Sequence, residues 1–429
     1  MMRKHPRCIG GFLWVLADEG VKRVDMDGFI DNQGNFGADG IVGPHHEKEG
    51  SYYTIKQLWS PVQVMNTAID RNFNGRLSVE NRYDYLNLNT CRFIWQQVKF
   101  PSVTDVSNTT TRILKQGEVQ GSDVAAHGVG VVDIKTPILP EADALFLTAI
   151  DKYGHELWRW TFPVDKLNRE TEQFSASSGR ASYTETEKGI TVKANGRTFV
   201  FSKEDGQLKD VSVNNRKISF ANGPRFIGAR RADRSLDQFY NHDDEKAKAK
   251  DRTYTEFPDA AVFTKLDVKE EGGNLILTAN YKLGNLDKAQ WTIHPDGMAT
   301  LDYTYNFSGV VDLMGICFDY PEGQVLSKRW LGAGPYRVWQ NRIHGTQYDI
   351  WENDYNDPIP GETFTYPEFK GYFGSVSWMS IRTKEGTISL TNETPDSYIG
   401  VYQPRDGRDR LLYTLCLLYT SPSPRDRSL

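Results

Sequence analysis

Cysteine is scarce in this sequence, with four residues among 429. Cys8, Cys91, Cys317 and Cys416 stand far apart, and no two of them form the closely spaced pair that zinc sites use. A structural zinc site or a disulfide framework is therefore not expected. Cysteine usage also leaves the cellular compartment undecided, since isolated thiols occur in reducing and oxidising compartments alike.

Long apolar runs are also missing. No stretch approaches the roughly 20 apolar residues that a membrane-spanning helix requires. The first 17 residues place basic residues before a short apolar run, but Gly10 and Gly11 interrupt that run and no small-residue cleavage site follows, so we do not interpret it as a signal peptide. Cytoplasmic and periplasmic locations both stay open.

A surplus of positive charge is absent as well. The formal net charge is −5, and the basic residues are scattered along the chain. Nothing resembles the basic surface that tracks a phosphate backbone. We therefore expect no nucleic-acid partner, and no membrane partner either.

Aromatic residues, in contrast, are abundant. They make up 12% of the chain, including ten Trp and 21 Tyr. This composition favours β-sandwiches, which pack aromatic rings between their sheets, and sugar sites, which stack the apolar face of a pyranose on a ring. The length is typical of about two or three domains.

Residues 1–61 combine a strand pattern, a loop and a helix pattern. The apolar run from Ile9 to Ala17 has the length and low charge of a parallel strand that is buried on both faces. A loop rich in Gly, Asn and Asp follows. Ser51 to Leu58 then begins with a hydroxyl residue and stops before Pro61, as a short helix does. This order predicts the last β/α unit of a barrel.

Residues 62–167 predict an immunoglobulin-like sandwich. Short alternating segments recur with turn signals between them, and about a hundred residues of this kind are typical of that fold. In the last segment Trp158, Trp160 and Phe162 share one face, with Arg159 on the other. We interpret the two tryptophans as core or interdomain residues. The expected strands are Leu77 to Val79, Cys91 to Gln97, Ala144 to Ile150 and Leu157 to Phe162.

Residues 168–180 are polar and predict a linker, and residues 181–410 predict a third, β-rich unit. Its turns are expected at Ala194 to Arg197 and at Glu204 to Gly206. The charged run 243–250 indicates a solvated helix or loop. The stretch from Trp330 to Trp378 is dense in Trp, Tyr, Gly and Pro, and it predicts long irregular loops of the kind that hold sugar contacts.

The tail, residues 411–429, repeats Leu-Leu-Tyr-Thr and ends in a Ser-Pro-Ser-Pro run. It lacks the alternation of a strand. We predict that it is a cloning or sequencing read-through that packs poorly.

Several motifs resemble family 2 glycoside hydrolases, and more narrowly their large β-galactosidases. Gly10-Gly11-Phe12-Leu13-Trp14, Asp39-Gly40-Ile41-Val42 and Trp59-Ser60-Pro61 are similar to the end of the catalytic barrel. The third unit resembles the family's C-terminal small-chain sandwich through 195–199, 204–208, 224–226 and 330–337. The resemblance implies a mainly β chain: the last β/α unit of a TIM barrel, an immunoglobulin-like sandwich and a truncated galactose-mutarotase-like β-supersandwich.

The resemblance also implies a retaining β-galactosidase that releases terminal β-D-galactose from β-galactosides such as lactose. Retaining glycosidases use two carboxyl groups about 5–5.5 Å apart. In the family both glutamates precede the Gly-Gly-Phe-x-Trp strand, so no catalytic residue is assigned here, and this chain alone is expected to be inactive. Glu80 and Glu393 stand in sandwich-like regions, and we interpret them as surface carboxylates.

Trp14 matches the family tryptophan that lines the galactose subsite, at the face of a barrel where active sites form. The alternative is a tryptophan packed in the barrel core. Phe36, through its carbonyl, and Asp39, through its side chain, match positions where the family holds a monovalent cation, Na⁺. An oxygen-only shell suits such a hard cation. The alternative for Asp39 is a plain turn before Gly40. The family's Mg²⁺ site is not in this chain.

Two neighbouring features are interpreted as structural. Asp18 is expected to cap or pair at the strand end, and His45 and His46 are expected to be loop residues, because adjacent side chains do not readily converge on one metal. Other functions stay open: a non-catalytic carbohydrate-binding or scaffold module, or another family 2 specificity such as β-glucuronidase or β-mannosidase. The expected partner is a β-galactoside sugar, and the full-length protein could form a homo-oligomer.

Overall fold

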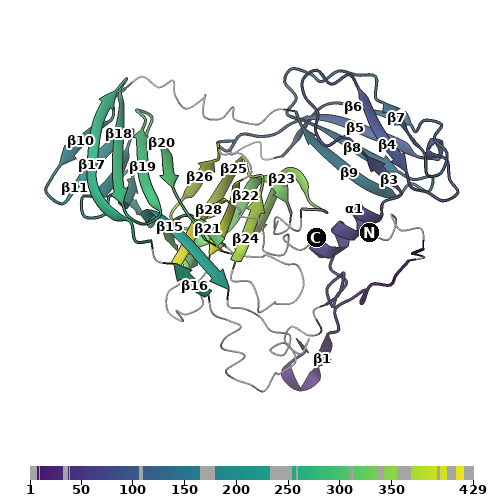
Figure 1. Ribbon diagram of the computed structural model, residues 1–429, viewed down its shortest axis with the longest axis horizontal. Coiled ribbons are helices and arrows are strands. Elements are labelled where there is room, and N and C mark those ends of the chain that lie inside the picture. Colours follow the sequence, from purple (N-terminus) through teal and green to yellow (C-terminus); the bar gives the residue numbers. More distant parts are fainter. Residues whose placement is uncertain are drawn as a thin grey trace.

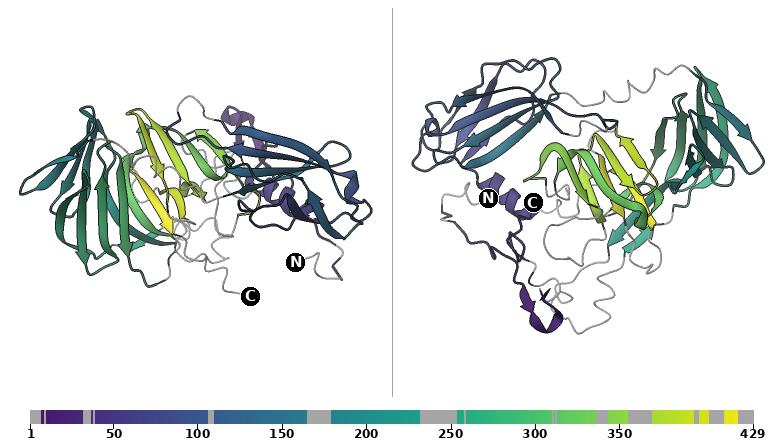
Figure 2. Two further views of the ribbon diagram at one scale, coloured as in Figure 1. Left: turned by 90° about the horizontal axis from the view of Figure 1, so that it is seen from above. Right: turned by 180° about the vertical axis from the view of Figure 1, so that it is seen from behind.

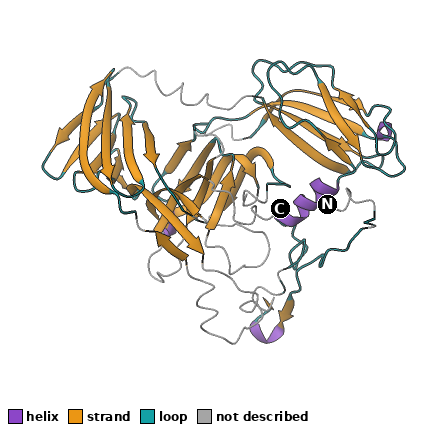
Figure 3. Cartoon of the chain, viewed as in Figure 1, coloured by secondary structure: helices purple, strands orange, loops and turns teal. Residues whose placement is uncertain are grey.

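The structure is a computed structural model, and most of its regular structure is strand (Figures 1 and 3). The prediction of a mainly β chain is confirmed. The last β/α unit of a TIM barrel is not confirmed and stays a prediction. The structure describes residues 7–8, 10–31, 37, 39–105, 110–164, 179–231, 254–257, 259–309, 311, 313–335, 343–354, 369–393, 397–402 and 412–419. The predicted linker and the charged run 243–250 lie largely or wholly outside them.

Residues 62–164 fold into two antiparallel sheets, which we call the first sandwich. Three strands form one sheet and four form the other, the strand number of a constant-type immunoglobulin fold. The four predicted strands are present, each with boundaries within a few residues of those expected. The sheets are β3 (Val62–Val64), β4 (Arg76–Asn81) and β7 (Val129–Asp133), and β6 (Arg112–Gln120), β5 (Arg92–Lys99), β8 (Ala144–Ile150) and β9 (Glu156–Pro163).

The core of the first sandwich lies between these sheets. Trp158, Trp160 and Phe162 of β9 are all buried in it, while Arg159 points to the other face of the strand. This alternation is the one predicted, and it follows from the two-residue period of a strand. The interpretation of both tryptophans as core residues is confirmed.

The second sandwich, residues 179–419 as far as described, is built on one large sheet. Eleven strands belong to it, and β14 and β16 pair at its side. The turns predicted at Ala194 to Arg197 and Glu204 to Gly206 separate its strands as expected. The strands are β10 (Ser182–Glu185), β11 (Gly189–Ala194), β12 (Arg197–Ser202), β13 (Leu208–Val213), β14 (Arg216–Ile218), β15 (Ala221–Arg231), β16 (Tyr254–Phe257), β21 (Leu313–Pro321), β24 (Phe369–Gly374), β27 (Ser397–Tyr402) and β28 (Leu412–Tyr419).

Two four-stranded sheets pack against this large sheet (Figure 2). One core joins β11, β12 and β21 to β18 and β19, with Phe201 against Trp291 at its centre. The other joins β22 and β25 to β24 and β27, where Trp330 stacks on Phe373. The two sheets are β17 (Val262–Glu271), β18 (Asn274–Lys282), β19 (Leu286–Ile293) and β20 (Ala299–Tyr305), and β23 (Gln347–Asp354), β22 (Val325–Gly334), β25 (Trp378–Thr383) and β26 (Thr387–Thr391).

Two expectations for this half of the chain were wrong. The stretch 330–378, predicted as long loops, contributes to four strands, β22 to β25. Its alternation was hidden because β22 is covered on both faces, by Phe373 below Trp330 and by the first sandwich beside Leu331. Within the tail, Leu412–Tyr419 forms β28 between β21 and β27, so the expectation that the tail lacks a strand was wrong. The interpretation of the tail as a read-through stays a prediction. Residues 420–429 lie outside the described residues.

The two sandwiches meet at a mixed apolar and ionic interface. Phe100 and Phe146 of the first sandwich pack against Leu331 and Trp378 of the second. Beside them Arg159 binds Asp349 with an Nη2–Oδ2 distance of 2.8 Å, and its guanidinium lies 4.5 Å from the ring centre of Phe146. This partly buried ion pair, next to the apolar cluster, helps to fix the relative position of the two units.

Glu385 connects two sheets of the second sandwich. Its carboxylate accepts hydrogen bonds from the N–H and hydroxyl of Ser219, at 2.9 and 2.6 Å, and from the buried Tyr320 hydroxyl at 2.8 Å. Burial by itself raises the pKa of Glu385, but these hydrogen bonds and the charge of Lys217 outweigh it, so the net pKa lies below the usual value. Burial also raises the pKa of Tyr320 to about 12.

This geometry predicts a pH dependence. A carboxyl whose pKa is lower in the folded than in the unfolded chain stabilises the fold above its unfolded pKa, about 4.3, and loses that contribution as pH falls through the lower folded value. We expect the free energy of unfolding of the Glu385→Gln variant, measured by urea unfolding, to fall less than that of the wild type when the pH is lowered from about 5 to about 3. Glu118→Gln, at an exposed ion pair with Arg92, is the control. Parallel curves for wild type and Glu385→Gln would contradict the prediction.

Candidate functional site

The candidate site lies on residues 10–59, the N-terminal segment. It contains β1 (Val21–Arg23), the 3₁₀ turn η2 (Val24–Met26), β2 (Phe29–Asp31) and helix α1 (Gly50–Trp59). The helix is confirmed close to its predicted bounds. The strand predicted from Ile9 to Ala17 is wrong as drawn: among the described residues of that run, only Ala17 forms a β-bridge, with Val42 in parallel. A strand is defined by a ladder of hydrogen bonds to a neighbouring strand, and among the described residues this run has one short pairing.

That short pairing is well formed. The Val42 N–H donates to the Leu16 carbonyl at 3.0 Å, and the Asp18 N–H donates to the Val42 carbonyl at 2.9 Å. Gly40 makes the approach possible, because a Cβ there would lie 2.3 Å from the Asp18 nitrogen. The Asp39-Gly40 motif therefore has a steric reason: residue 40 passes directly against the neighbouring backbone.

Asp18 has the structural role that was predicted. Its Oδ1 accepts a hydrogen bond from the Gly40 N–H at 2.7 Å, which ties the two paired stretches together. Burial raises the pKa of Asp18, the Gly40 N–H opposes this, and the negative charges of Asp39 and Glu47 add to the rise. The loop prediction for His45 and His46 is also confirmed, since both lie in the turn between Gly43 and Lys48.

The structure leaves the predicted sugar and cation residues as predictions. Trp14 lies three residues before the β-bridge of Ala17 with Val42, and it is 77% exposed. Asp39 is exposed as well, beside the Asp18 and Gly40 contact. Phe36 lies outside the described residues, so the pairing of Phe36 with Asp39 at a cation stays a prediction. Among the described residues, no three His, Cys, Asp or Glu side chains gather as a metal site would require.

The two carboxylates that we set aside lie where they were expected. Glu80 pairs with Arg82 at 2.7 Å on the first sandwich, and Glu393 is exposed after β26.

The N-terminal segment exposes many large apolar side chains. Eight of those between residues 12 and 29 are at least half exposed. In the described part of residues 10–59, Val42 is the single hydrophobic residue that is buried. Soluble proteins rarely leave so many together without a partner surface. The eight are Phe12, Leu13, Trp14, Leu16, Val21, Val24, Met26 and Phe29.

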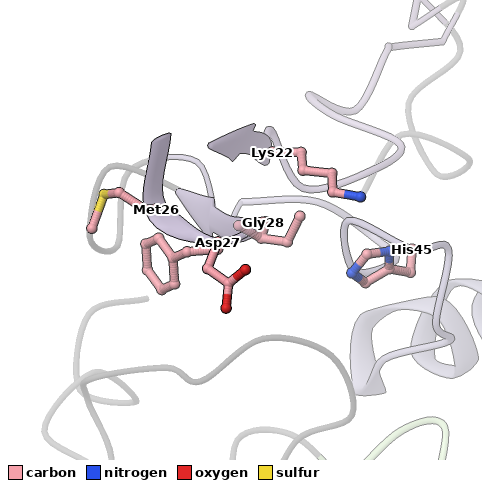
Figure 4. Close-up of a pocket in the computed structure, with 7 residues that line it drawn as sticks. Lys22, Met26, Asp27, Gly28 and His45 are labelled. Carbon is pink, nitrogen blue, oxygen red and sulfur yellow. The ribbon is translucent and has the colours of Figure 1, made fainter. Parts of the chain in front are cut away.

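A shallow pocket of about 480 Å³ lies on the β1–β2 hairpin (Figure 4). In Figure 4 the Lys22 amine and the His45 ring lie near each other on one side, and Met26 lies on the opposite side. Asp27, Gly28, Phe29 and Ile30 complete the lining. Trp14 and Asp39 do not line it. The sequence reasoning missed this hairpin, although Asp27-Gly28 is a hairpin signal, and both residues have positive φ, 55° and 81°.

No helix in the described part of the chain has the length and apolarity to cross a membrane. The longest, α1, has ten residues.

Comparison with known proteins supplies the family. The chain is 21% identical to a β-galactosidase of Priestia megaterium (strain DSM 319 / IMG 1521), over 91% of this chain and 38% of that protein. It is 19% identical to a β-galactosidase of Pseudoalteromonas haloplanktis, over 83% of this chain and 37% of that protein. The chain thus spans a little over a third of the length of these curated relatives. The family described as the β-galactosidase small chain matches residues 193–410, just over half of the chain and most of the second sandwich, so the chain belongs to that family.

Proposed function

We propose that this chain is the C-terminal part of a retaining β-galactosidase, which hydrolyses terminal β-D-galactosides. The match of the second sandwich to the β-galactosidase small chain carries the proposal. The two relatives named β-galactosidase support it, because they align with nearly the whole chain. In this proposal the acid/base and the nucleophilic glutamate both belong to upstream residues, and this chain alone is inactive.

Trp14 would contribute shape and stacking. An exposed indole offers a flat apolar face to the ring hydrogens of a galactose, and it transfers no proton. Trp14 is 77% exposed in this chain, so the face of its ring is accessible for such a contact. The upstream residues would cover the remaining exposed apolar side chains of residues 12–29.

Asp39 and the carbonyl of Phe36 would hold a monovalent cation beside the sugar. The exposed carboxylate of Asp39 offers the kind of oxygen donor that suits a hard cation. Such an ion, when bound, supplies a fixed positive charge near a sugar hydroxyl. Asp39 itself would orient that hydroxyl through its second oxygen.

The test uses the chain in two forms. We expect the chain alone to hydrolyse no chromogenic β-galactoside, and the chain extended with its upstream coding sequence to be active with retention of the anomeric configuration. In the extended protein we expect Trp14→Ala to lower kcat/KM by about tenfold, the loss of one stacking contact. Trp59→Ala, at an exposed tryptophan of α1, is the control.

Three results would refute the proposal. Activity of the isolated chain would place the catalytic carboxyls within it. If the extended protein cleaves β-glucuronides or β-mannosides faster than β-galactosides, the proposed substrate specificity is wrong. Equal kcat/KM for Trp14→Ala and wild type would remove Trp14 from the sugar site.

A further inference from the structure

Helix α1 is held by contacts outside itself. None of its ten residues is buried, and the N-cap residue Glu49 makes no side-chain capping bond. Tyr53 packs on the core of the first sandwich, and Lys56 pairs with Glu156 of β9 at 2.9 Å. A short helix with so little support of its own depends on tertiary contacts for its position.

The second sandwich supplies one such contact, the turn 343–346 that leads into β23. The Thr54 hydroxyl donates to the His344 carbonyl at 2.8 Å, and the Gly345 N–H donates to the Gln57 side-chain oxygen at 2.6 Å. Thr54 and Gln57 lie about one turn apart and so share a face of the helix. The turn therefore binds α1 at two points through its backbone.

Position 345 allows a side chain no room. Gly345 has φ of +86°, and a Cβ there would lie 2.4 Å from the Thr54 nitrogen and 2.7 Å from the Tyr53 carbonyl carbon. Both atoms are backbone, so neither can rotate away. The strand that follows the turn also carries Gln347 and Asp349, which bind Arg159 of the first sandwich.

We propose that the turn 343–346 is a positioning site for α1, with Gly345, Thr54 and Gln57 as its determinants. It fixes where the N-terminal segment leaves the two sandwiches, because residues 10–48 reach them through this helix (Figure 1). On the proposed function, the same contact sets the place of Trp14 relative to the upstream residues; this consequence rests on that function, whereas the contact itself does not.

Hydrogen exchange on the chain itself tests the contact. We expect the amides of α1 to exchange about tenfold faster in Gly345→Ala and in the double variant Thr54→Val/Gln57→Leu, while those of β18 and β19 are unchanged. Gly154→Ala is a matched control, because Gly154 has a similar φ of +91° but no atom within 4 Å of its Cβ position. The double variant leaves the turn intact, so it decides the outcome if Gly345→Ala disturbs folding.

Unchanged exchange of α1 in the double variant would overturn the proposal, as would equal acceleration in Gly154→Ala. In the extended protein, we expect Gly345→Ala to raise KM for a β-galactoside about threefold or more, with Gly154→Ala at the wild-type value. If the extended wild type cleaves no β-galactoside, the proposed function is wrong. The hydrogen-exchange experiment still tests the contact between the turn and α1, because it does not depend on activity. If the extended wild type is active and KM is unchanged in Gly345→Ala, the consequence for Trp14 is wrong.

Discussion

Replacing Asn81 by alanine is expected to lower the free energy of unfolding of the first sandwich by about 2–3 kcal/mol. Asn81 lies at the end of β4 with no solvent exposure. Its Nδ2 donates to the carbonyls of Leu86, Val124 and Ala125 at 2.9 to 3.1 Å, and its Oδ1 accepts the Tyr83 N–H at 3.1 Å. Alanine removes the two N–H donors that these three carbonyls share, together with the acceptor of the Tyr83 N–H, in a place that water does not reach.

The carbonyls of Val124 and Ala125 each keep a backbone donor, so the cost stays below the sum of four lost bonds. Asn81→Asp is expected to be worse than alanine, because a second oxygen would face the same carbonyls and a charge would be buried. Urea unfolding followed by tryptophan fluorescence measures both. The control is Asn74→Ala in an exposed turn, where one bond to the Arg76 N–H is lost. A cost for Asn81→Ala no larger than that of the control would contradict the prediction.

Replacing Trp378 by alanine is expected to cost about 3–5 kcal/mol and to separate the unfolding of the two sandwiches. Trp378 is 2% exposed and belongs to the cluster that joins Phe100 and Phe146 to the second sandwich. The Arg329 guanidinium lies 5.3 Å from its ring centre. Its loss would leave a cavity at the middle of the interface and take away the largest side chain of the apolar cluster, so the remaining apolar contacts and the Arg159–Asp349 pair would hold the units together less tightly.

Calorimetry measures the result, as two thermal transitions in Trp378→Ala against coupled unfolding in the wild type. Trp330→Ala is the control, because Trp330 is equally buried but stacks on Phe373 inside the second sandwich. It should destabilise that sandwich by a similar amount without separating the transitions. One cooperative transition in Trp378→Ala, or the same splitting in both variants, would show that the cluster does not couple the units.

Local sequence patterns predicted strands well where one face of the strand is buried and the other is exposed to solvent. In β9 the alternation of Trp158, Arg159 and Trp160 gave the strand, its faces and its core residues. The same logic failed for β22, where Trp330 and Leu331 are buried on opposite faces and no polar side remained to mark the period. It also failed for residues 10–16, whose apolar pattern is typical of a strand but which, in the described structure, pair only at their end, where Val15 and Leu16 accept hydrogen bonds from Ile41 and Val42.

Around the candidate site, Asp39-Gly40 was identified through its resemblance to the family. The structure supplies the steric reason for the glycine, which passes directly against the neighbouring backbone. The pocket residues Lys22 and His45 could not be identified from the sequence, since they meet only when the hairpin and the following turn fold toward each other.

By itself, the sequence determined that this is an aromatic-rich, mainly β chain with its turns, its first core and its resemblance to β-galactosidases, because these depend on residue type and short spacing. The tertiary structure alone decided which distant residues meet. Arg159 and Asp349 lie 190 positions apart, and Gln57 and Gly345 lie 288 apart. No local period encodes such pairs, because they are selected by the packing of whole sheets and by the burial that makes an unpaired polar group costly.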